Sequence, residues 1–235
     1  MLLPSKLELI EMHAEALFLH DDRGRMLAVN DVERGAAARL YLGRTVEGNI
    51  WRFRHDLGPG LISRLEAILA DEPVATDLEP SAVTTERLHD ALSQYAPVER
   101  IWEGPAWHFP ERIDEPVDVP VQQVTPDMEI AGDRFTWLVD EIEYCGPAFV
   151  VMDGERVVSL CHSSRNTPAA AEAGVETLEG HRGRGFATAV VTTWARAVRA
   201  EGREPLYSTS WENHASRRLA RKLDLRLYGS DLHFT

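Results

Sequence analysis

A glycine-rich stretch followed by a helical pattern is the part of the sequence best suited to chemistry. GHRGRG, residues 180–185, precedes an amphipathic helical pattern over residues 186–200. Glycine lets successive backbone N–H groups turn toward one point, and a helix begins with unpaired N–H groups and a positive dipole end. Arg182 and Arg184 would add cationic donors. The pattern predicts a cradle for phosphate or pyrophosphate, with a plain strand-to-helix turn as the alternative.

Two common nucleotide-binding patterns fit this stretch poorly. A P-loop requires Lys followed by Ser or Thr after its second glycine, where this chain has Phe186 and Ala187. The dinucleotide fingerprint requires a third Gly or Ala, where this chain has Thr188. The stretch therefore belongs to neither class.

The stretch and a later segment resemble the GNAT superfamily of acyl-CoA-dependent N-acyltransferases. Gly183 and Gly185 match the family's phosphate loop, [Gln/Arg]-x-x-Gly-x-[Gly/Ala]. The family's later pattern, Asn-x-x-Ala/Ser-x-x-Leu-x-x-Lys-Leu, begins at Asn213 and reaches Lys222 and Leu223. The resemblance implies an α/β (α+β) fold with a mixed, mostly antiparallel sheet flanked by helices, and acetyl-CoA as co-substrate without a metal. The cofactor-binding residues that it implies are Val175, Thr177, Leu178, Arg182, Gly183, Arg184, Gly185, Ala187, Thr188 and Asn213.

The sequence departs from the family's pattern at two functional positions. Gly180 stands where the family has Gln or Arg, and Ala220 stands where many members have a tyrosine that protonates the departing thiolate. A thiolate whose conjugate thiol has a pKa of about 8.5 is a fair leaving group, so the reaction does not require that tyrosine. Solvent or Tyr207 is the alternative proton donor.

Acyl transfer to an amine also requires a base, because an amine with a pKa of about 10.4 is mostly protonated at pH 7. Glu172 and Glu176 are the candidates, since residues four apart on a strand point to the same face. His162, at the end of another expected strand, is an alternative base. A solvating role for both carboxylates is the remaining interpretation.

Charge is distributed unevenly along the chain, whose formal net charge is −13. Residues 180–226 contain 10 basic and 4 acidic side chains, whereas residues 117–179 contain 3 basic and 12 acidic ones. The acidic balance argues against nucleic acid as the principal partner. The basic segment fits an anionic ligand or a solvated helix surface, and the acidic one fits an amine entrance or plain solubilising charge.

The length of 235 residues allows two small domains. The segment 104–120 contains four prolines and predicts an extended connector. This places the domain boundary near residue 115, with one domain at residues 1–115 and the other at residues 116–235. No apolar run approaches the roughly 18 residues that span a bilayer, and Cys145 and Cys161 are too few for a disulfide framework. We therefore expect no membrane partner and a cytoplasmic location.

Hydrophobic periodicity and turn residues predict alternating helices and strands in both domains. The expected helices cover residues 5–17, 60–70, 84–95, 186–200 and 214–223. The expected strands cover residues 17–20, 25–30, 38–44, 49–57, 147–152, 156–162, 173–178, 204–211 and 225–228.

Together these observations predict an N-acetyltransferase that moves an acetyl group from acetyl-CoA to a primary amine of a small molecule or protein. A coenzyme A-binding regulatory module without catalysis is the alternative. The first domain has no assigned role, and a degenerate GNAT-like copy is one interpretation of it. A homodimer is left open as an alternative to a monomer.

Overall fold

A computed structural model describes residues 4–80, 82–114, 119–132 and 134–235, and the chain forms two compact units. Unit 1 runs to Trp107 and also includes Ser208–Asn213 and Leu227–Thr235. Unit 2 consists of His108–Tyr207 and His214–Arg226. The predicted boundary at residue 115 lies outside the described residues.

Unit 1 is built on a sheet with the strand order β4-β3-β11-β5, beside a separate β1–β2 hairpin. β11 is antiparallel to β3, with Leu232 opposite Leu42. The elements are α1 (Lys6–Leu17), β1 (Phe18–His20), β2 (Met26–Val29), β3 (Leu40–Thr45), β4 (Gly48–Phe53), α2 (Pro59–Ala70), α3 (Ala82–Ser93), β5 (Ile101–His108) and β11 (Arg226–Phe234).

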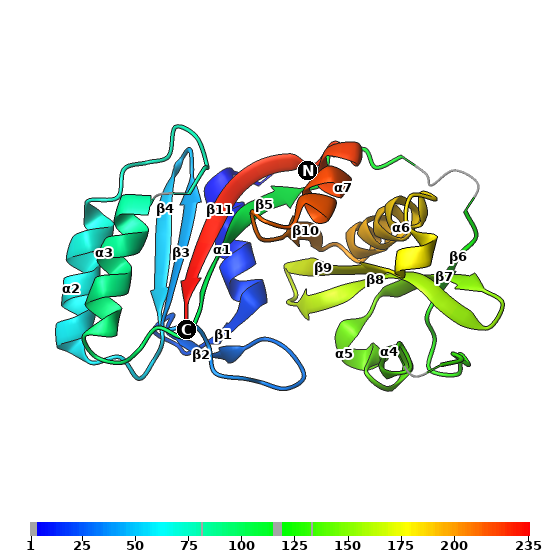
Figure 1. Ribbon diagram of the computed structural model, residues 1–235, viewed down its shortest axis with the longest axis horizontal. Helices are drawn as coiled ribbons and strands as arrows, with labels where there is room; N and C mark the ends of the chain where they lie inside the picture. Colours follow the sequence, from blue (N-terminus) through cyan, green and yellow to red (C-terminus); the bar gives the residue numbers. More distant parts are fainter. Residues whose placement is uncertain (1–3, 81, 115–118, 133) are drawn as a thin grey trace. The chain divides into compact units, whose positions relative to one another are not determined.

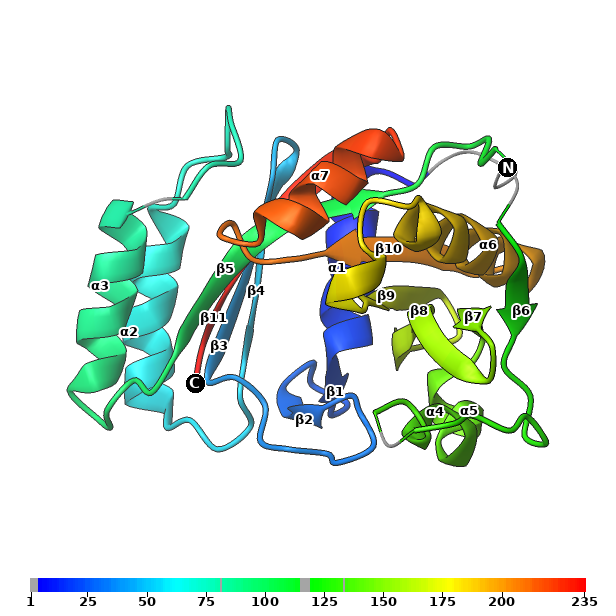
Figure 2. The same cartoon turned by 45° about the vertical axis from the view of Figure 1, so that its right-hand side comes forward.

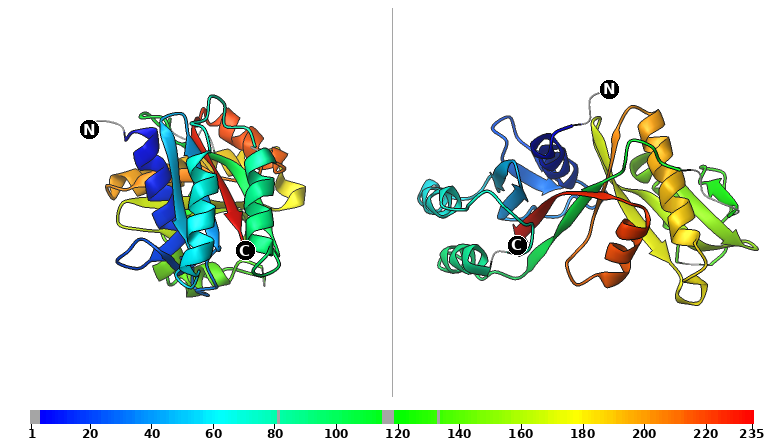
Figure 3. Two further views of the ribbon diagram at one scale, coloured as in Figure 1. Left: turned by 90° about the vertical axis from the view of Figure 1, so that its left-hand side faces the viewer. Right: turned by 90° about the horizontal axis from the view of Figure 1, so that it is seen from above.

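Helices cover both faces of the unit 1 sheet (Figures 2 and 3). α2 and α3 bury Leu65 and Leu88 against Leu42 and Phe234 of the strands. α1 packs on the other face at Gly43, where an added Cβ would lie 2.5 Å from Cγ1 of Ile10. Glycine at this position allows the close approach of helix and strand.

Unit 2 is built on a sheet with the strand order β10-β9-β8-β7-β6, antiparallel apart from the parallel β10–β9 pair. α6 lies on one face, and α4 and α5 lie on the other (Figure 1). The elements are β6 (Val121–Gln123), α4 (Trp137–Asp140), α5 (Ile142–Cys145), β7 (Ala148–Asp153), β8 (Arg156–Asn166), β9 (Ala170–Thr177), a 3-10 turn (Glu179–His181), α6 (Phe186–Ala200), β10 (Glu204–Ser208) and α7 (His214–Lys222). The predicted mixed, mostly antiparallel sheet with flanking helices is confirmed.

The structure extends or corrects several predicted elements. β9 begins three residues before its expected start, and β11 continues to Phe234 rather than ending at Tyr228. The expectation that residues 104–108 belong to an extended connector is wrong, because they form the second half of β5. Thr209 donates its amide to the carbonyl of Pro105, so the proline still takes part in backbone pairing through its acceptor.

Neither a membrane-spanning helix nor a metal-binding cluster is present in the described ranges. None of the helices there combines the length and apolar character needed to cross a bilayer. No group of three or more His, Cys, Asp or Glu side chains in the same ranges is arranged to hold a metal ion.

Candidate functional site

The predicted phosphate loop connects β9 to α6 and contains two glycines in left-handed conformations. Gly183 has φ +77° and Gly185 has φ +84°, a region that side chains with a Cβ rarely adopt. Gly185 is the N-cap of α6, so the unpaired N–H groups of the first helical turn begin immediately after it. An added Cβ at either glycine would meet no atom within 4 Å, so the loop borders open space.

The start of the loop is held by polar contacts within unit 2. Nε of Arg182 donates to the carbonyl oxygen of Thr177 at 3.3 Å. Nε2 of His181 lies 3.3 Å from a carboxylate oxygen of Asp153 in the β7–β8 turn. These contacts fix the direction in which the loop leaves β9.

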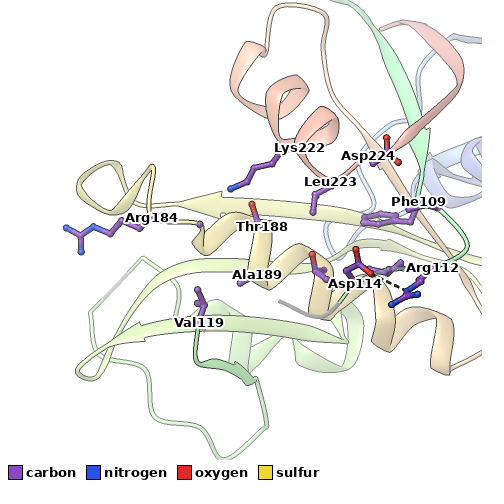
Figure 4. A pocket seen from close by; sticks show the side chains of 14 residues that line it. Phe109, Arg112, Asp114, Val119, Arg184, Thr188, Ala189, Lys222, Leu223 and Asp224 are labelled. Atoms are coloured by element: carbon purple, nitrogen blue, oxygen red, sulfur yellow. Dashed lines mark ion pairs between the residues drawn. The ribbon is translucent and has the colours of Figure 1, made fainter. Parts of the chain in front are cut away.

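A cavity of about 480 Å³ opens at the end of this loop (Figure 4). α6 lines it through Gly185, Thr188, Ala189 and Thr192, α7 and the residues after it through Lys222, Leu223 and Asp224, and the segment before β6 through residues 109–110, 112–114 and 119, with Arg184 beside the loop. Figure 4 shows the Lys222 side chain extending from α7 above Thr188. The volume falls in the range of small-molecule sites, which is about 300–1,000 Å³.

One wall of the cavity is attached to α6 by a single arginine. The guanidinium of Arg199 donates to the carbonyl oxygens of three consecutive residues, at 2.9 Å to Phe109 and to Glu111 and also to Pro110. The segment before β6 is thereby anchored along the helix that carries the phosphate loop.

The strand that leads into the loop separates from its neighbour halfway along. β10 pairs with β9 only from Glu204↔Ala170 to Leu206↔Glu172. Residues 173–177 of β9 pair with β8 alone in the described part of the chain. A gap between the two strands therefore begins after Glu172, on the side toward the phosphate loop.

Glu172 and Glu176 lie on the predicted common face of β9, toward α4 and α5. Arg134, just before α4, donates Nε to the Glu176 carboxylate at 2.8 Å and Nη2 to the same oxygen. Glu172 is 4% exposed. His162 of β8 lies on the same face, where its ring meets that of Trp137 edge-on at 5.0 Å between centroids. Burial, helped by the positive charge of Arg165, lowers the pKa of His162 to about 4.

Val175 and Thr177 lie on the other face of β9, toward α6. The hydroxyl groups of Thr177 and Ser159 share a hydrogen bond of 2.7 Å. Four residues further along β8, Ser163 accepts a hydrogen bond from the indole of Trp194 in α6 at 3.0 Å. The two faces of β9 are thus chemically different, with titratable groups on one side and hydroxyl and apolar groups on the other.

The match to known proteins agrees with this arrangement. The GNAT acetyltransferase family model matches residues 140–229, which contain β7 to α7. Residues 140–229 are therefore the part of the chain that is assigned to the GNAT superfamily.

Solved GNAT structures share low identity with the chain. A putative GNAT-family acetyltransferase from Novosphingobium aromaticivorans is 17% identical over 58% of this chain, with a TM-score of 0.45. The chain spans 65% of that protein, less than two thirds of its length. A GNAT-family acetyltransferase from Colwellia psychrerythraea is 10% identical over 99% of this chain and 97% of its own, with a TM-score of 0.49. AAC(6')-Iy, in complex with the bisubstrate analogue CoA-S-monomethyl-acetylneamine, is 17% identical over 46% of this chain and 90% of its own, with a TM-score of 0.35.

No curated protein matches the chain.

Ala220, which stands where many GNAT proteins have a tyrosine, lies in α7. Ala220 is completely buried. Tyr207 of β10 reaches α7 one turn earlier, where its hydroxyl lies 2.5 Å from the hydroxyl of Ser216. Burial raises the pKa of Tyr207 to about 12. Tyr207 is therefore a hydrogen-bonding group at neutral pH, and proton transfer from it to a thiolate is unfavourable.

Three further residues differ in their relation to the predicted cofactor site, namely Lys222, Leu178 and Asn213. Lys222 lines the cavity, although the sequence expectation did not include it among the cofactor-binding residues. Its place in the Asn-to-Leu pattern was the signal that could have identified it. Leu178 donates its amide to Val158 at 2.9 Å. Asn213 belongs to unit 1, and its contact with the cofactor stays a prediction.

Proposed function

We propose that the protein is an N-acetyltransferase that transfers an acetyl group from acetyl-CoA to a primary amine of a small molecule or protein. The observation that carries the proposal is the combination of the Gly183–Gly185 loop, which borders open space at the start of α6, with the separation of β9 from β10. A pyrophosphate fits the first feature, because the loop offers backbone N–H groups at a positive helix end. An extended thioester arm fits the second.

The residues around the loop supply the remaining contacts for the donor. Arg182, Arg184 and Lys222 lie around the loop, and their positive charge supports phosphate binding there. Ala187 and Thr188 belong to the first turn of α6. The backbone of β9 at Val175 and Thr177 runs along the gap between the strands. An acyl arm in that gap can pair with this backbone as a neighbouring strand would.

The transfer forms a C–N bond between the amine and the acetyl carbon and breaks the C–S bond of the thioester. The developing oxyanion requires a preorganised N–H donor. The amide of Leu178 is already donated to Val158, so the donor must come from the residues of β9 before it. Three groups on the face of the sheet toward α4 and α5 can take the amine proton, namely Glu172, Glu176 and His162.

Charge and the state of the cysteines bear on the acceptor and on the setting of the reaction. The acidic composition of residues 117–179 supports a cationic amine, because opposite charge raises the rate of encounter. Cys145 and Cys161 are both free and buried, which supports the expected reducing, cytoplasmic location. A homodimer stays a prediction.

The phosphate loop is tested by introducing a side chain with negative charge. Gly183→Glu and Gly185→Glu should each abolish acetyl-CoA binding in calorimetry, because both strain the left-handed backbone and repel phosphate. Gly60→Glu is the matched control, since it lies in the first turn of α2 where an added Cβ meets no atom. Wild-type affinity in both loop variants would refute the proposed site.

Catalysis is tested separately by single-turnover loss of the thioester with a panel of amines. An enzyme consumes acetyl-CoA at a rate that depends on the amine. Binding without amine-dependent consumption would instead indicate the regulatory module.

A further inference from the structure

We propose that His162 is the general base of the transfer and that Gly174 is the residue that positions it. The inference rests on the proposed acetyltransferase function, and it selects His162 over Glu172 and Glu176.

Gly174 lies directly opposite His162 in the antiparallel β8–β9 pair. A Cβ added to Gly174 would lie 2.3 Å from Nε2 of His162, 2.8 Å from Cδ2 and 2.9 Å from Cε1. The imidazole therefore lies against the backbone of β9 at this residue. Any side chain at Gly174 would displace the ring.

Glycine is otherwise a poor choice in the interior of a strand, because it costs backbone entropy and offers no side chain to pack. Gly174 does not adopt the left-handed conformation that justifies glycine in the phosphate loop. The close approach of the His162 ring is the remaining physical reason for glycine here. The strand gives up packing at one position so that an imidazole can occupy it.

The position of the ring relative to the strands suits a base. Nε2 lies over Gly174, two residues beyond the last β9–β10 pair at Glu172 and one residue before Val175. An acyl group in the gap would hold its carbonyl against the β9 backbone that follows. An amine that approaches from the α4–α5 side would meet Nε2, while Trp137 holds the ring from the side.

The surroundings of His162, Glu172 and Glu176 differ in how well they suit a proton acceptor. Arg165, on the same strand, and burial both favour the neutral imidazole, so Nε2 keeps a lone pair that can accept a proton. The same shift, to a pKa of about 4, makes the imidazole a weak base, so the proton has to pass as C–N bond formation makes the amine nitrogen more acidic. Glu176 already accepts two hydrogen bonds from Arg134, and a proton would have to compete with them. Glu172 lies in the part of β9 that is still paired with β10.

In the proposed step, Nε2 of His162 accepts the proton of the attacking amine as the C–N bond forms. The C–S bond then breaks, and its electron pair leaves on the coenzyme A thiolate. The imidazolium returns its proton to the thiolate or to solvent. Atoms and charge balance without any further reactant.

The experiment compares steady-state turnover of wild type with His162→Gln and Gly174→Ala. Both variants should lose about 100-fold or more in kcat, the usual contribution of a positioned base, while the KM for acetyl-CoA changes less than about twofold. Glu172→Gln and Glu176→Gln should lose less than about tenfold, since neither carboxylate is the proposed proton acceptor. His89→Gln and Gly60→Ala, both in unit 1, are the matched controls and should keep wild-type turnover.

Chemical rescue separates a base from a structural residue. Added imidazole should raise the turnover of His162→Ala in proportion to its concentration, because it replaces the missing proton acceptor. It should not rescue Gly174→Ala, whose own imidazole remains but is displaced. The double variant His162→Ala with Gly174→Ala should be no slower than His162→Ala alone, since the added methyl group then meets no ring.

Several results would overturn the inference. Turnover of His162→Gln within threefold of an active wild type would exclude His162 as the base. A 100-fold loss confined to Glu172→Gln or Glu176→Gln would assign that carboxylate instead. If His162→Ala does not fold, His162→Gln and Gly174→Ala still decide. Absence of amine-dependent turnover in the wild type overturns the proposed function, and with it this inference.

Discussion

Unit 1 and unit 2 place their buried ionisable groups in different settings. In unit 1, Arg44 and Glu72 form a buried ion pair of 2.8 Å, and Thr84 donates to the same carboxylate. Asp231 and His233 form a second close pair at 2.6 Å on β11. In unit 2, His162 instead lies on a glycine where the sheet begins to separate.

This difference separates a stabilising arrangement from a reactive one. A buried charged group that is paired with a nearby side chain is held in one position by that partner. An imidazole beside a gap between strands remains able to exchange a proton with whatever enters the gap. The comparison assigns stability to unit 1 and chemistry to unit 2, and four predictions test it.

The largest effect is expected from removing residues 227–235. These residues form most of β11, whose Tyr228, Leu232 and Phe234 are buried, and β11 pairs with β3. Burial of each such side chain contributes about 1.5–3 kcal/mol, so the loss approaches the whole stability of a domain, about 5–15 kcal/mol. The truncated chain should lose the cooperative unfolding of unit 1 in circular dichroism. Leu227→Ser, at a side chain 40% exposed, is the control, and an unchanged transition after truncation would contradict the assignment of β11 to unit 1.

The next largest effect is expected at the buried ion pair of unit 1. Glu72→Ala leaves the Arg44 guanidinium buried without its carboxylate, which costs about 3–5 kcal/mol. Urea unfolding should show this loss, while kcat of the folded variant stays at the wild-type value. Glu66→Ala removes an exposed carboxylate of α2 and should change stability by less than about 0.5 kcal/mol. A fall in kcat without a fall in stability would reverse the comparison.

The third effect is a pH dependence of stability that originates in unit 2. The pKa of His162 is lowered from 6.5 to about 4, mainly by burial, so between these values the unfolded chain binds a proton that the folded protein excludes. Stability should therefore fall as the pH is lowered through this window, by on the order of 3 kcal/mol. Urea unfolding at several pH values should show a shallower dependence for His162→Gln than for wild type. Equal slopes would mean that the pKa of His162 is the same in the folded and the unfolded chain.

The smallest effect is expected at Tyr207. Its pKa of about 12 lies above the thiol pKa of about 8.5, so the phenol cannot usefully protonate the leaving thiolate. Tyr207→Phe removes the hydrogen bond to Ser216 and should cost about 1 kcal/mol of stability with less than about a tenfold change in kcat. Tyr144→Phe, at an exposed tyrosine of α5, is the control. A 100-fold loss of kcat at unchanged stability would make Tyr207 the proton donor after all.

The elements that can be predicted from the amino-acid sequence are those whose causes are local. The turn at Gly183 and Gly185 is predictable because glycine is required at its two left-handed residues, and α6 because its apolar residues recur at helical spacing. Phosphate binding by this turn stays a prediction. Side chains alternate between the two faces of a strand, so Glu172 and Glu176, four residues apart, are predicted to share one face. These properties depend on neighbours within a few residues of each other.

Only the tertiary structure decided the contacts between distant residues. Nothing in the sequence indicates that the His162 ring packs against Gly174 or that Arg134 binds Glu176. The sequence also does not show that β11 pairs with β3 of unit 1. β5 was missed because Gly104 and Pro105 oppose strand formation locally, yet the main chain at Thr209 donates to Pro105. Strand pairing joins segments that can lie a hundred or more residues apart, and its free energy comes from burial and hydrogen bonds that exist only after the chain has folded.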